Sequence, residues 1–412
     1  MAELLDLAAA RRIALESAHG RAVEAEPIEL ARALGRVLAE DVGAECDLPA
    51  FASSAMDGFA VRALDTAATT EADPATLEVV AESRAGHPAE RALAEGQAIA
   101  ISTGAVVPQG ADAVVRVEET VREGSRVAVL KAVLPGTDVR GAGEDVRAGE
   151  PVLSRGTTIG AAELGVLASL GHANVACAPR PRVRILTTGD ELVQQGSPLR
   201  VGTLYDSNSH SLAALARCAG AEVIGTGHAP DDPALTRDAL AATLDCDVAL
   251  ICGGISVGAH DHVKEGLAAL GVSERFHGIA LRPGKPAWFG LKGSTLVFGL
   301  PGNPVSAMVT FVLLAGPALR TLAGARETGC ALPARLAHPY EKPPGRTHAV
   351  RCRLRAGADG LLADPTGPQG SHILTSMLGA DALALIPREC GRMEAGAAVE
   401  VELLAPWVGW MA

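Results

Sequence analysis

The region from residue 181 to residue 325 alternates short apolar stretches with longer amphipathic ones, and this pattern constrains the fold more than any other feature of the chain. The apolar stretches predict strands, and the amphipathic stretches predict helices between them. The expected strands are 183–187, 222–226, 247–252 and 295–298, and the expected helices are 209–219, 232–244, one through 263–270, and 304–322. Strands that alternate with helices form right-handed crossover units. We therefore expect a doubly wound, mostly parallel α/β sheet.

The regions on either side of this sheet have different textures. Leucines and alanines recur near the helical period at the N-terminus, and a second helix is predicted over 28–40. Between about 76 and 149, short apolar stretches separated by glycines indicate a small β-rich domain, and a helix follows over 161–170. The C-terminal part alternates apolar and charged residues at 350–355 and 399–403. We expect a β-sandwich or barrel of about 80 residues there.

Length and composition set the class of protein. A chain of 412 residues corresponds to roughly two to four domains. Apolar residues make up 48% of the chain and charged residues 20%, which argues against disorder. The net charge is −12 and aromatic residues make up 3%, whereas a nucleic-acid binder usually has a basic surface and aromatic stacking platforms. We expect a globular protein that does not bind nucleic acid.

The cysteines and the apolar runs point to a cytoplasmic protein. The eight cysteines are scattered, with no CxxC pair, which is typical of free thiols in a reducing compartment. The start of the sequence shows no secretory signal pattern. The longest uncharged run, 295–319, is interrupted by PGNP at 301–304 and so is not a single membrane helix. We therefore expect no contact with a membrane.

Chemistry in such a sheet is expected at the loops that follow the strands. In open α/β sheets, ligands bind beyond the carboxyl ends of the strands. The four loops are TGDE at 188–191, PDD at 230–232, GGISVGAHDH at 253–262 and LPGNP at 300–304. Because the strands are expected to be parallel, all four loops should lie at one edge of the sheet.

Two kinds of chemical group share this edge. The glycine-rich loop and the PGNP turn (301–304) expose backbone N–H groups, which bind anions and phosphates above all. The other group is a set of carboxylates: Asp190, Glu191, Asp231, Asp232 and Asp261. A carboxylate beside a phosphate costs on the order of 4 kcal/mol at intermediate dielectric, and a hard cation such as Mg²⁺ removes this conflict by binding both. The pattern predicts a phosphate-bearing ligand and Mg²⁺.

Each motif also has a purely structural interpretation. Asp232 followed by Pro233 is a good helix start, and Asp261 also suits a helix cap. The carboxylates at 190 and 191 follow a glycine turn, where charged side chains that only face solvent are also common. The glycine string is weak by itself, and the histidines at 260 and 262 suit a solvated loop as well as a metal site. The argument for a site therefore depends on the expected co-location.

Common nucleotide motifs are missing, but a basic loop is present. The sequence has neither the G-x-x-x-x-G-K-[ST] string of a P-loop nor a G-x-G-x-x-G between a strand and a helix. The segment RPGKP at 282–286, here called the basic loop, adds a rigid loop with two cations. An oxyanion clamp and an ordinary surface turn both remain open for it.

Seven short motifs appear in an order that resembles one known family. They are SAMDGFA at 54–60, STGA at 102–105, TGDEL at 188–192, GGISVG at 253–258, PGKP at 283–286, LPGNPVS at 300–306 and QGSH at 369–372. Each motif alone is modest, but seven in register along essentially the whole chain make the match specific. The chain is similar to the MoeA family of molybdopterin molybdenumtransferases, which includes the C-terminal domain of gephyrin.

The resemblance implies a four-part subunit in an elongated homodimer, with active sites between subunits. The implied parts are an elongated N-terminal domain (1–50 and 140–180), an inserted β-rich domain (51–139), an α/β molybdopterin-binding domain (181–325) and a C-terminal β-barrel (326–412). Family members hydrolyse the phosphoanhydride of adenylated molybdopterin with a divalent cation, insert molybdate and release AMP. The resemblance thus implies Mg²⁺ as cofactor, these two substrates, and transient contact with a molybdopterin adenylyltransferase.

Matching positions carry the family's functional residues onto this chain. Glu191 is expected to bind the metal or to organise the attacking water. Asp190 and Asp231 are the other expected metal ligands, while Asp57 and Asp261 are further expected catalytic residues. Asp57 and Thr103 would approach from other domains across the dimer interface. The expected substrate-binding residues are Thr103, Asp145, Asp231, Gly253, Gly254, Ser256, Gly258, Arg282, Lys285, Pro301, Asn303, Pro304, Arg351 and Ser371.

Two positions depart from the family pattern. Many relatives carry a lysine at the position of Gly278 and another where this chain has Arg282. Arginine still holds an oxyanion, often through two hydrogen bonds, whereas Gly278 removes one cation. The departure concerns how molybdate or phosphate is bound, and not the class of reaction.

The rival interpretation is a dimeric scaffold that binds partner peptides, as the corresponding domain of gephyrin does with receptor loops. The full set of carboxylates favours the enzyme, because a pure scaffold has no need of it. A nucleotide-dependent dehydrogenase is disfavoured by the missing glycine fingerprint. We therefore expect an enzyme of molybdenum cofactor biosynthesis.

Overall fold

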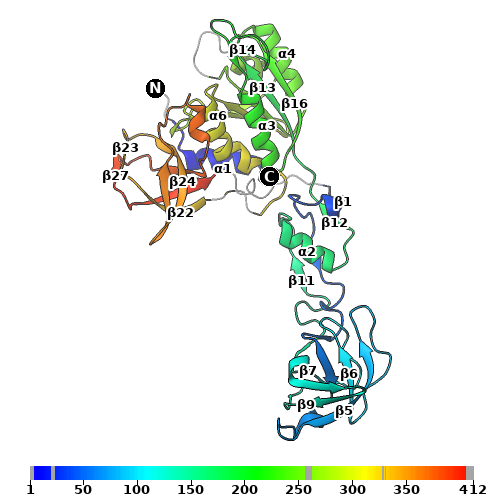
Figure 1. Cartoon of the computed structure of the whole chain (residues 1–412). Helices are drawn as coiled ribbons and strands as arrows, with labels where there is room; N and C mark the ends of the chain where they lie inside the picture. The colour runs from blue at the N-terminus through cyan, green and yellow to red at the C-terminus, as the bar shows by residue number, and fades with distance from the viewer. Residues whose placement is uncertain (1–3, 20–23, 256–261, 327–328, 330, 405–412) are drawn as a thin grey trace.

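The computed structural model describes residues 4–19, 24–255, 262–326, 329 and 331–404. The molecule is elongated (Figure 1): an α/β domain and a C-terminal β-barrel lie together at one end, and a β-rich domain lies at the other. A slender stem, built from two stretches of chain around β1, β12, α2 and β11, joins the two ends. The expected fold class, a doubly wound α/β domain with an additional β-rich domain and a C-terminal barrel, is confirmed.

The α/β domain is built on one six-stranded sheet. The strand order is β16 (Glu222–Ala229), β13 (Arg182–Thr188), β17 (Val248–Cys252), β21 (Thr295–Leu300), β20 (Trp288–Lys292) and β18 (Ser273–His277). The first four strands are parallel, as predicted. β20 pairs antiparallel with β21, and β18 pairs antiparallel with β20; neither of these two strands was predicted. Every residue of β17 and β21 is buried, as expected for strands covered on both faces.

Helices cover both faces of this sheet. One face packs against α1 (Leu7–Ala18), α3 (Asn208–Cys218), α6 (Pro304–Thr310) and α7 (Gly316–Leu322). The other face packs against α4 (Pro233–Thr243) and α5 (Val263–Ala269). A short π-helical segment, Phe311–Ala315, joins α6 to α7. The continuous helix Pro304–Leu322 is long and apolar enough to cross a membrane, but 89% of its most apolar window lies inside the protein, so it is a core helix.

The β-rich domain is a second six-stranded sheet at the far end of the stem. Its order is β7 (Ala113–Arg116), β4 (Gly58–Val61), β6 (Gln97–Ile101), β5 (Ala75–Ser83), β9 (Arg126–Val129) and β8 (Thr120–Glu123). A core of small and β-branched residues, including Val61, Val115 and Val127, fills the space behind this sheet. The predicted glycine-separated strands are thus present in this region.

The stem consists of short antiparallel ladders and one helix. β1 (Glu26–Glu29) pairs with β12 (Asn174–Cys177), β2 (Val42–Gly43) with β11 (Pro151–Leu153), and β3 (Ser53–Ser54) with β10 (Val139–Arg140); the helix is α2 (Ala161–Ser169). The predicted helix over 28–40 is wrong. Ile28 pairs with Val175 in the ladder, and Gly35 adopts a positive φ of 71°, which ends any helix. Tertiary pairing overrides the local helix propensity here.

The C-terminal domain is a closed barrel. Its strands are β22 (Ala331–Leu336), β24 (Thr347–Gly357), β25 (Gly360–Pro365), β26 (Ala382–Ile386) and β28 (Ala398–Leu403), with pairing between β24 and β26 closing the ring. A two-stranded antiparallel ladder of β23 (Tyr340–Glu341) and β27 (Arg392–Met393), which are distant in the sequence, is added to it. A strand of the α/β domain, β19 (Leu281–Arg282), adds to β24 in parallel. The basic loop therefore begins where the two domains join.

An ion pair ties the first helix to this barrel. Nη1 of Arg11 on α1 lies 3.0 Å from Oε2 of Glu402 on β28, and the Glu402 side chain is 1% exposed. Replacing Arg11 with alanine removes a charge-assisted hydrogen bond to a buried carboxylate, so we expect a loss of roughly 2 kcal/mol in the free energy of unfolding. The measurement is urea unfolding followed by circular dichroism.

The matched control for this prediction is Arg12→Ala. Arg12 pairs with Glu16 on the exposed face of the same helix, and such a pair contributes about 0.5 kcal/mol or less. Equal unfolding midpoints for the two variants would show that the pair between Arg11 and Glu402 does not hold the helix to the barrel.

Candidate active site

The loops that follow the four parallel strands lie at one edge of the α/β sheet. Thr188 at the end of β13 pairs in register with Ala229, and Cys252 at the end of β17 pairs with Leu300. The ends of β13 and β17 are also neighbours, through Thr187 and Cys252. We call this edge, formed by the described residues 188–191, 230–232, 253–254 and 300–304, the rim. The co-location that the sequence predicted is therefore present.

Two carboxylates of the rim hold each other's loops. The backbone N–H of Asp231 donates to Oδ1 of Asp190 over 3.0 Å, and the N–H of Asp190 lies 3.5 Å from Oδ2 of Asp231. Both residues are exposed. Asp232 has a different role, because its carboxylate accepts from the N–H groups of Ala234 and Leu235 at the start of α4. The structural interpretation therefore applies to Asp232, while Asp190 and Asp231 form an accessible acidic pair.

Glu191 completes the acidic side of the rim. Its carboxylate folds back over Gly189, since a Cβ placed on Gly189 would lie 2.2 Å from Oε2 of Glu191. The residue is exposed. Across the described ranges, no three His, Cys, Asp or Glu side chains converge closely enough to hold a metal ion by themselves. Within the described residues, the rim therefore does not by itself supply a complete set of protein ligands for a cation.

The glycines after β17 allow the chain to pass close to β13. A Cβ on Gly253 would lie 2.7 Å from Oγ1 of Thr188, and one on Gly254 would lie 2.5 Å from Cγ2 of Val263. Both glycines have positive φ angles, 95° and 61°, so other residues are excluded by space and by backbone conformation. Three expected site residues, Ser256, Gly258 and Asp261, lie outside the described residues.

The PGNP turn presents free amides at the rim. Gly302 and Asn303 are exposed, and within the described chain no acceptor takes their N–H groups. Pro301 is buried, and its carbonyl accepts from Sγ of Cys252 over 3.3 Å. Burial raises the pKa of the Cys252 thiol strongly, so this group is a neutral donor. Pro304 is the first residue of α6. The turn therefore has the donors that an oxyanion requires.

The C-terminal barrel contacts this turn through Ser371. Nδ2 of Asn303 lies 3.2 Å from Oγ of Ser371, and the N–H of Val305 donates to the Ser371 carbonyl. The barrel also contacts the start of the basic loop, where β19 brings Arg282 into register with His348 of β24. Burial, followed by the charges of the nearby Arg282 and other cations, lowers the pKa of His348 to about 4. His348 is therefore neutral near pH 7.

Arg351 is fully buried, although it lies on the charged side of the predicted alternation. Its guanidinium donates to Oγ of Ser376 and to the carbonyls of Pro368 and Gly370 over 3.2–3.4 Å. Within the described chain, Nη1 has no hydrogen-bond partner. Burial lowers the pKa of this guanidinium. Arg351 thus fixes the segment that leads directly to Ser371.

Three expected site residues lie far from the rim of the same chain. Oδ1 of Asp57 accepts from the N–H and Oγ1 of Thr103 over 2.7 and 3.1 Å, in the β-rich domain. The N–H of Asp145, between β10 and β11 of the stem, donates to the Leu48 carbonyl. Figure 1 shows this domain at the opposite end of the molecule from the α/β domain. One chain therefore does not bring Asp57 and Glu191 together.

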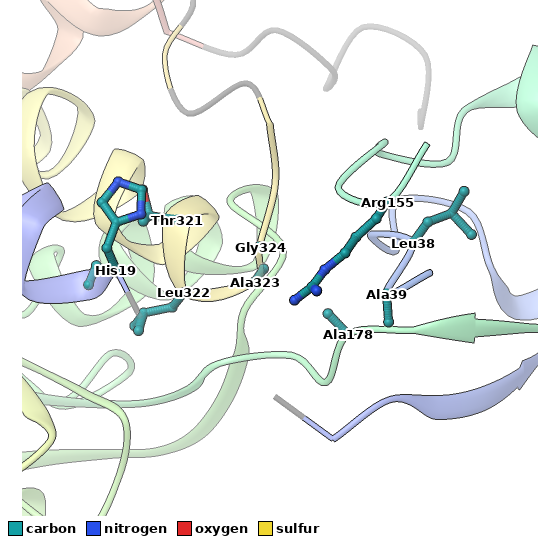
Figure 2. A pocket seen from close by; sticks show the side chains of 10 residues that line it. His19, Leu38, Ala39, Arg155, Ala178, Thr321, Leu322, Ala323 and Gly324 are labelled. Atoms are coloured by element: carbon teal, nitrogen blue, oxygen red, sulfur yellow. The ribbon is translucent and has the colours of Figure 1, made fainter. Parts of the chain in front are cut away.

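A cavity of about 220 Å³ lies elsewhere, where the stem meets the α/β domain (Figure 2). It is lined by the ends of α1 and α7 and by stem residues, with the side chain of Arg155 reaching between them. Ala178, which lines it, lies shortly before β13. The cavity is therefore near the amino ends of the parallel strands, at the edge opposite the rim.

Sequence reasoning missed polar residues that support the rim from below. Asp206 accepts from Oγ1 of Thr187 over 2.9 Å and from the N–H of Ser209. Asn208, which is 7% exposed, donates from Nδ2 to the carbonyl of Gly302 over 2.7 Å. The polar string DSNS at 206–209, which leads into the helix predicted over 209–219, was the available signal. This string is typical of an ordinary helix start, so the hydrogen bond from Asn208 to Gly302 was not predicted.

Comparisons with known proteins agree with this architecture. The MoeA N-terminal region (domain I and II) matches residues 5–171, a probable molybdopterin binding domain matches 184–321, and the MoeA C-terminal region (domain IV) matches 333–404. Molybdopterin molybdenumtransferase 2 of Mycobacterium tuberculosis is 38% identical over 392 residues, which cover 92% of this chain and 95% of the relative. The Haemophilus influenzae molybdopterin molybdenumtransferase is 34% identical, covering 92% and 94%.

A solved structure shows the same fold. The molybdopterin biosynthesis MoeA protein of Pyrococcus horikoshii superimposes with a TM-score of 0.83 at 31% sequence identity, covering 97% of this chain and 100% of that one. The similarity therefore includes the stem, the β-rich domain, the α/β domain and the barrel together. With its carboxylate and amide groups gathered at one rim, the chain belongs to the MoeA family and is a molybdopterin molybdenumtransferase of molybdenum cofactor biosynthesis.

Proposed function

We propose that the rim hydrolyses the phosphoanhydride of adenylated molybdopterin and inserts molybdate into the pterin dithiolene. Water attacks phosphorus, the P–O–P link breaks, and AMP and molybdopterin are the products of this step. The two thiol sulfurs of the pterin then replace oxygens of molybdate, which leave as water with protons from the thiols and from solvent. The observation that carries the proposal is the accessible pair of Asp190 and Asp231 at the same edge as the free amides of the PGNP turn.

The acidic side of the rim suits Mg²⁺. This ion is usually held by one or two carboxylates together with substrate phosphates, and not by a cage of protein ligands alone. Asp190, Asp231 and Glu191 would supply the carboxylates. When bound, Mg²⁺ would neutralise phosphate charge, polarise the phosphorus and position water. Asp261 is proposed as a further contact of this site.

The amide side of the rim suits the oxyanion. We place molybdate by the PGNP turn and the basic loop, where the free N–H groups of the turn and the cations Arg282 and Lys285 are the donors. Ser371 contacts the turn, and Arg351 holds the segment before it. Gly253 and Gly254, with Ser256 and Gly258, complete the proposed substrate contacts. Gly278 supplies no cation, so Arg282 carries more of the binding here.

The remaining residues are proposed to come from a second subunit. Asp57, Thr103 and Asp145 lie far from the rim of their own chain, and an elongated homodimer would place them against the rim of the partner. The adenylated pterin would be delivered by transient contact with a molybdopterin adenylyltransferase. We propose a cytoplasmic location, which the free thiols of the described cysteines support.

The test is a reconstituted assay of the purified, full-length protein. Adenylated molybdopterin, Mg²⁺ and molybdate are expected to give stoichiometric AMP and molybdenum cofactor, measured by chromatography and by activation of a cofactor-free molybdoenzyme. AMP release should stop when EDTA removes the metal and return when Mg²⁺ is added. A protein that binds the pterin but releases no AMP under these conditions would contradict the proposal and favour the scaffold interpretation.

A further inference from the structure

The side chain of Asn208 contacts the PGNP turn, and the capping of helix α3 does not explain this contact. It is the first residue of α3, yet the N–H of Ser209 is capped by Asp206 and not by Asn208. The Asn208 side chain instead crosses to a loop 94 residues away and donates from Nδ2 to the Gly302 carbonyl over 2.7 Å. The residue is 7% exposed. Its amide is therefore a buried donor committed to the turn.

The geometry of a trans peptide gives this contact a consequence. In a planar trans peptide, the carbonyl of one residue and the N–H of the next point in opposite directions. Because Asn208 holds the Gly302 carbonyl on the protein side, the N–H of Asn303 must face the other way. Asn303 is exposed, and no described residue accepts its N–H. The hydrogen bond thus directs a free donor toward the rim.

The preceding peptide is held in the same way. Sγ of Cys252 donates to the Pro301 carbonyl over 3.3 Å, so the N–H of Gly302 also faces outward. Ser371 holds the turn from the barrel side, through the Asn303 side chain and the N–H of Val305. Asn208 differs from these contacts because it fixes the central peptide of the turn.

The support of Asn208 also reaches the acidic side of the rim. Asp206, two residues earlier, accepts from Oγ1 of Thr187 over 2.9 Å, next to the loop that carries Asp190 and Glu191. The segment 206–209 is therefore attached both to the end of β13 and to the PGNP turn. A change at Asn208 can be confined to the amide side, because Asp206 keeps the attachment to β13.

We propose that Asn208 is a positioning residue that orients the peptide between Gly302 and Asn303 so that its N–H binds molybdate. This inference rests on the proposed function, because it assumes that the PGNP turn is where the oxyanion is held. Asn208→Asp keeps the shape of the side chain but replaces the donor with a carboxylate, which repels the Gly302 carbonyl. The peptide should then turn its N–H away from the rim.

The experiment measures molybdate binding to the full-length protein by isothermal titration calorimetry, and the Michaelis constants for molybdate and adenylated molybdopterin. Loss of one hydrogen bond to an anion corresponds to about a tenfold weakening. For Asn208→Asp we expect the dissociation constant and KM for molybdate to rise by about that factor, with the KM for the pterin within about twofold of wild type. Ser211→Ala, which removes a hydrogen bond to the backbone of Asn208 itself, is the control and should leave both constants unchanged.

The outcomes separate this inference from the proposed function. A wild-type protein that binds and uses no molybdate overturns both. A wild-type protein that binds molybdate, with Asn208→Asp equal to it, overturns the positioning role alone. If Asn208→Asp fails to fold, Asn208→Ala gives the same test without the added charge, and equal molybdate constants for that variant would also overturn the role.

Discussion

Replacing Glu191 with glutamine is expected to reduce Mg²⁺-dependent AMP release by roughly a thousandfold, while binding of adenylated molybdopterin changes little. The substitution keeps the shape of a side chain that folds over Gly189 at the exposed rim, but it removes the charge. Metal-assisted stabilisation of a phosphoryl transition state is worth several kcal/mol, and each 1.4 kcal/mol is a factor of ten. The rate is measured by chromatography of AMP in single turnovers, and binding by fluorescence of the pterin.

Asp232→Asn is the matched control for this prediction. Asp232 is an exposed carboxylate of the same rim, but it caps α4 through the N–H groups of Ala234 and Leu235. Asparagine caps a helix about as well as aspartate, so this variant removes one rim charge without removing a proposed ligand. Near wild-type AMP release is expected from it. If the two variants lost equal activity, the general potential of the rim, and not Glu191 itself, would be responsible.

Mixed dimers of two inactive variants are expected to regain about a quarter of wild-type activity. Asp57→Asn and Glu191→Gln should each be nearly inactive alone. If each active site combines the rim of one subunit with the β-rich domain of its partner, a mixed dimer has one site with both substitutions and one with neither. Random pairing makes half of the dimers mixed, and half of their sites intact, which gives about a quarter. The variants are unfolded and refolded together, and AMP release is measured per dimer.

A second mixture shows whether the restored activity has this origin. Asp231→Asn and Glu191→Gln both alter the rim of a single chain, where the loops of Asp231 and Asp190 are hydrogen-bonded. Every site in their mixed dimer carries one substitution, so no activity should return. Restoration in this control would mean that subunits assist each other by another route. No restoration in the first mixture would place Asp57 outside the site of the partner.

The parts of the fold that the sequence predicts are those with a strong periodic pattern. The central strands β17 and β21 are continuous apolar runs because they are buried on both faces, and such runs are easily recognised; β13 is largely buried, while β16 at the edge of the sheet has a shorter apolar start. The antiparallel strands β18 and β20 were missed, since polar residues in β18 conceal its pairing with β20. The segment 28–40 has helix-forming residues, but the returning chain at 174–177 pairs with its start. Distant pairing of this kind leaves no local pattern.

The candidate site was predictable to a similar extent. Parallel topology alone places the carboxylates and the amide-rich turn at one rim, and both are found there. Roles that depend on one contact were not predictable. Arg351 lies in an alternating strand pattern that suggests exposure, yet it is fully buried beneath the segment before Ser371. Asn208 looked like part of a helix start, because a hydrogen bond to residue 302 cannot be seen in residues 206–209.

The pairing of β3 with β10 has a consequence for how this protein can evolve. Ser53 and Ser54 lie opposite Arg140 and Val139, so the chain departs for the β-rich domain and comes back within about 5 Å of the same spot. The β-rich domain is therefore an insertion that begins and ends at neighbouring points of the stem. If it were removed, a few residues would connect the two ends, and the stem would keep its course. Exchanging this domain would alter the residues that it carries while leaving the rim of the same chain unchanged.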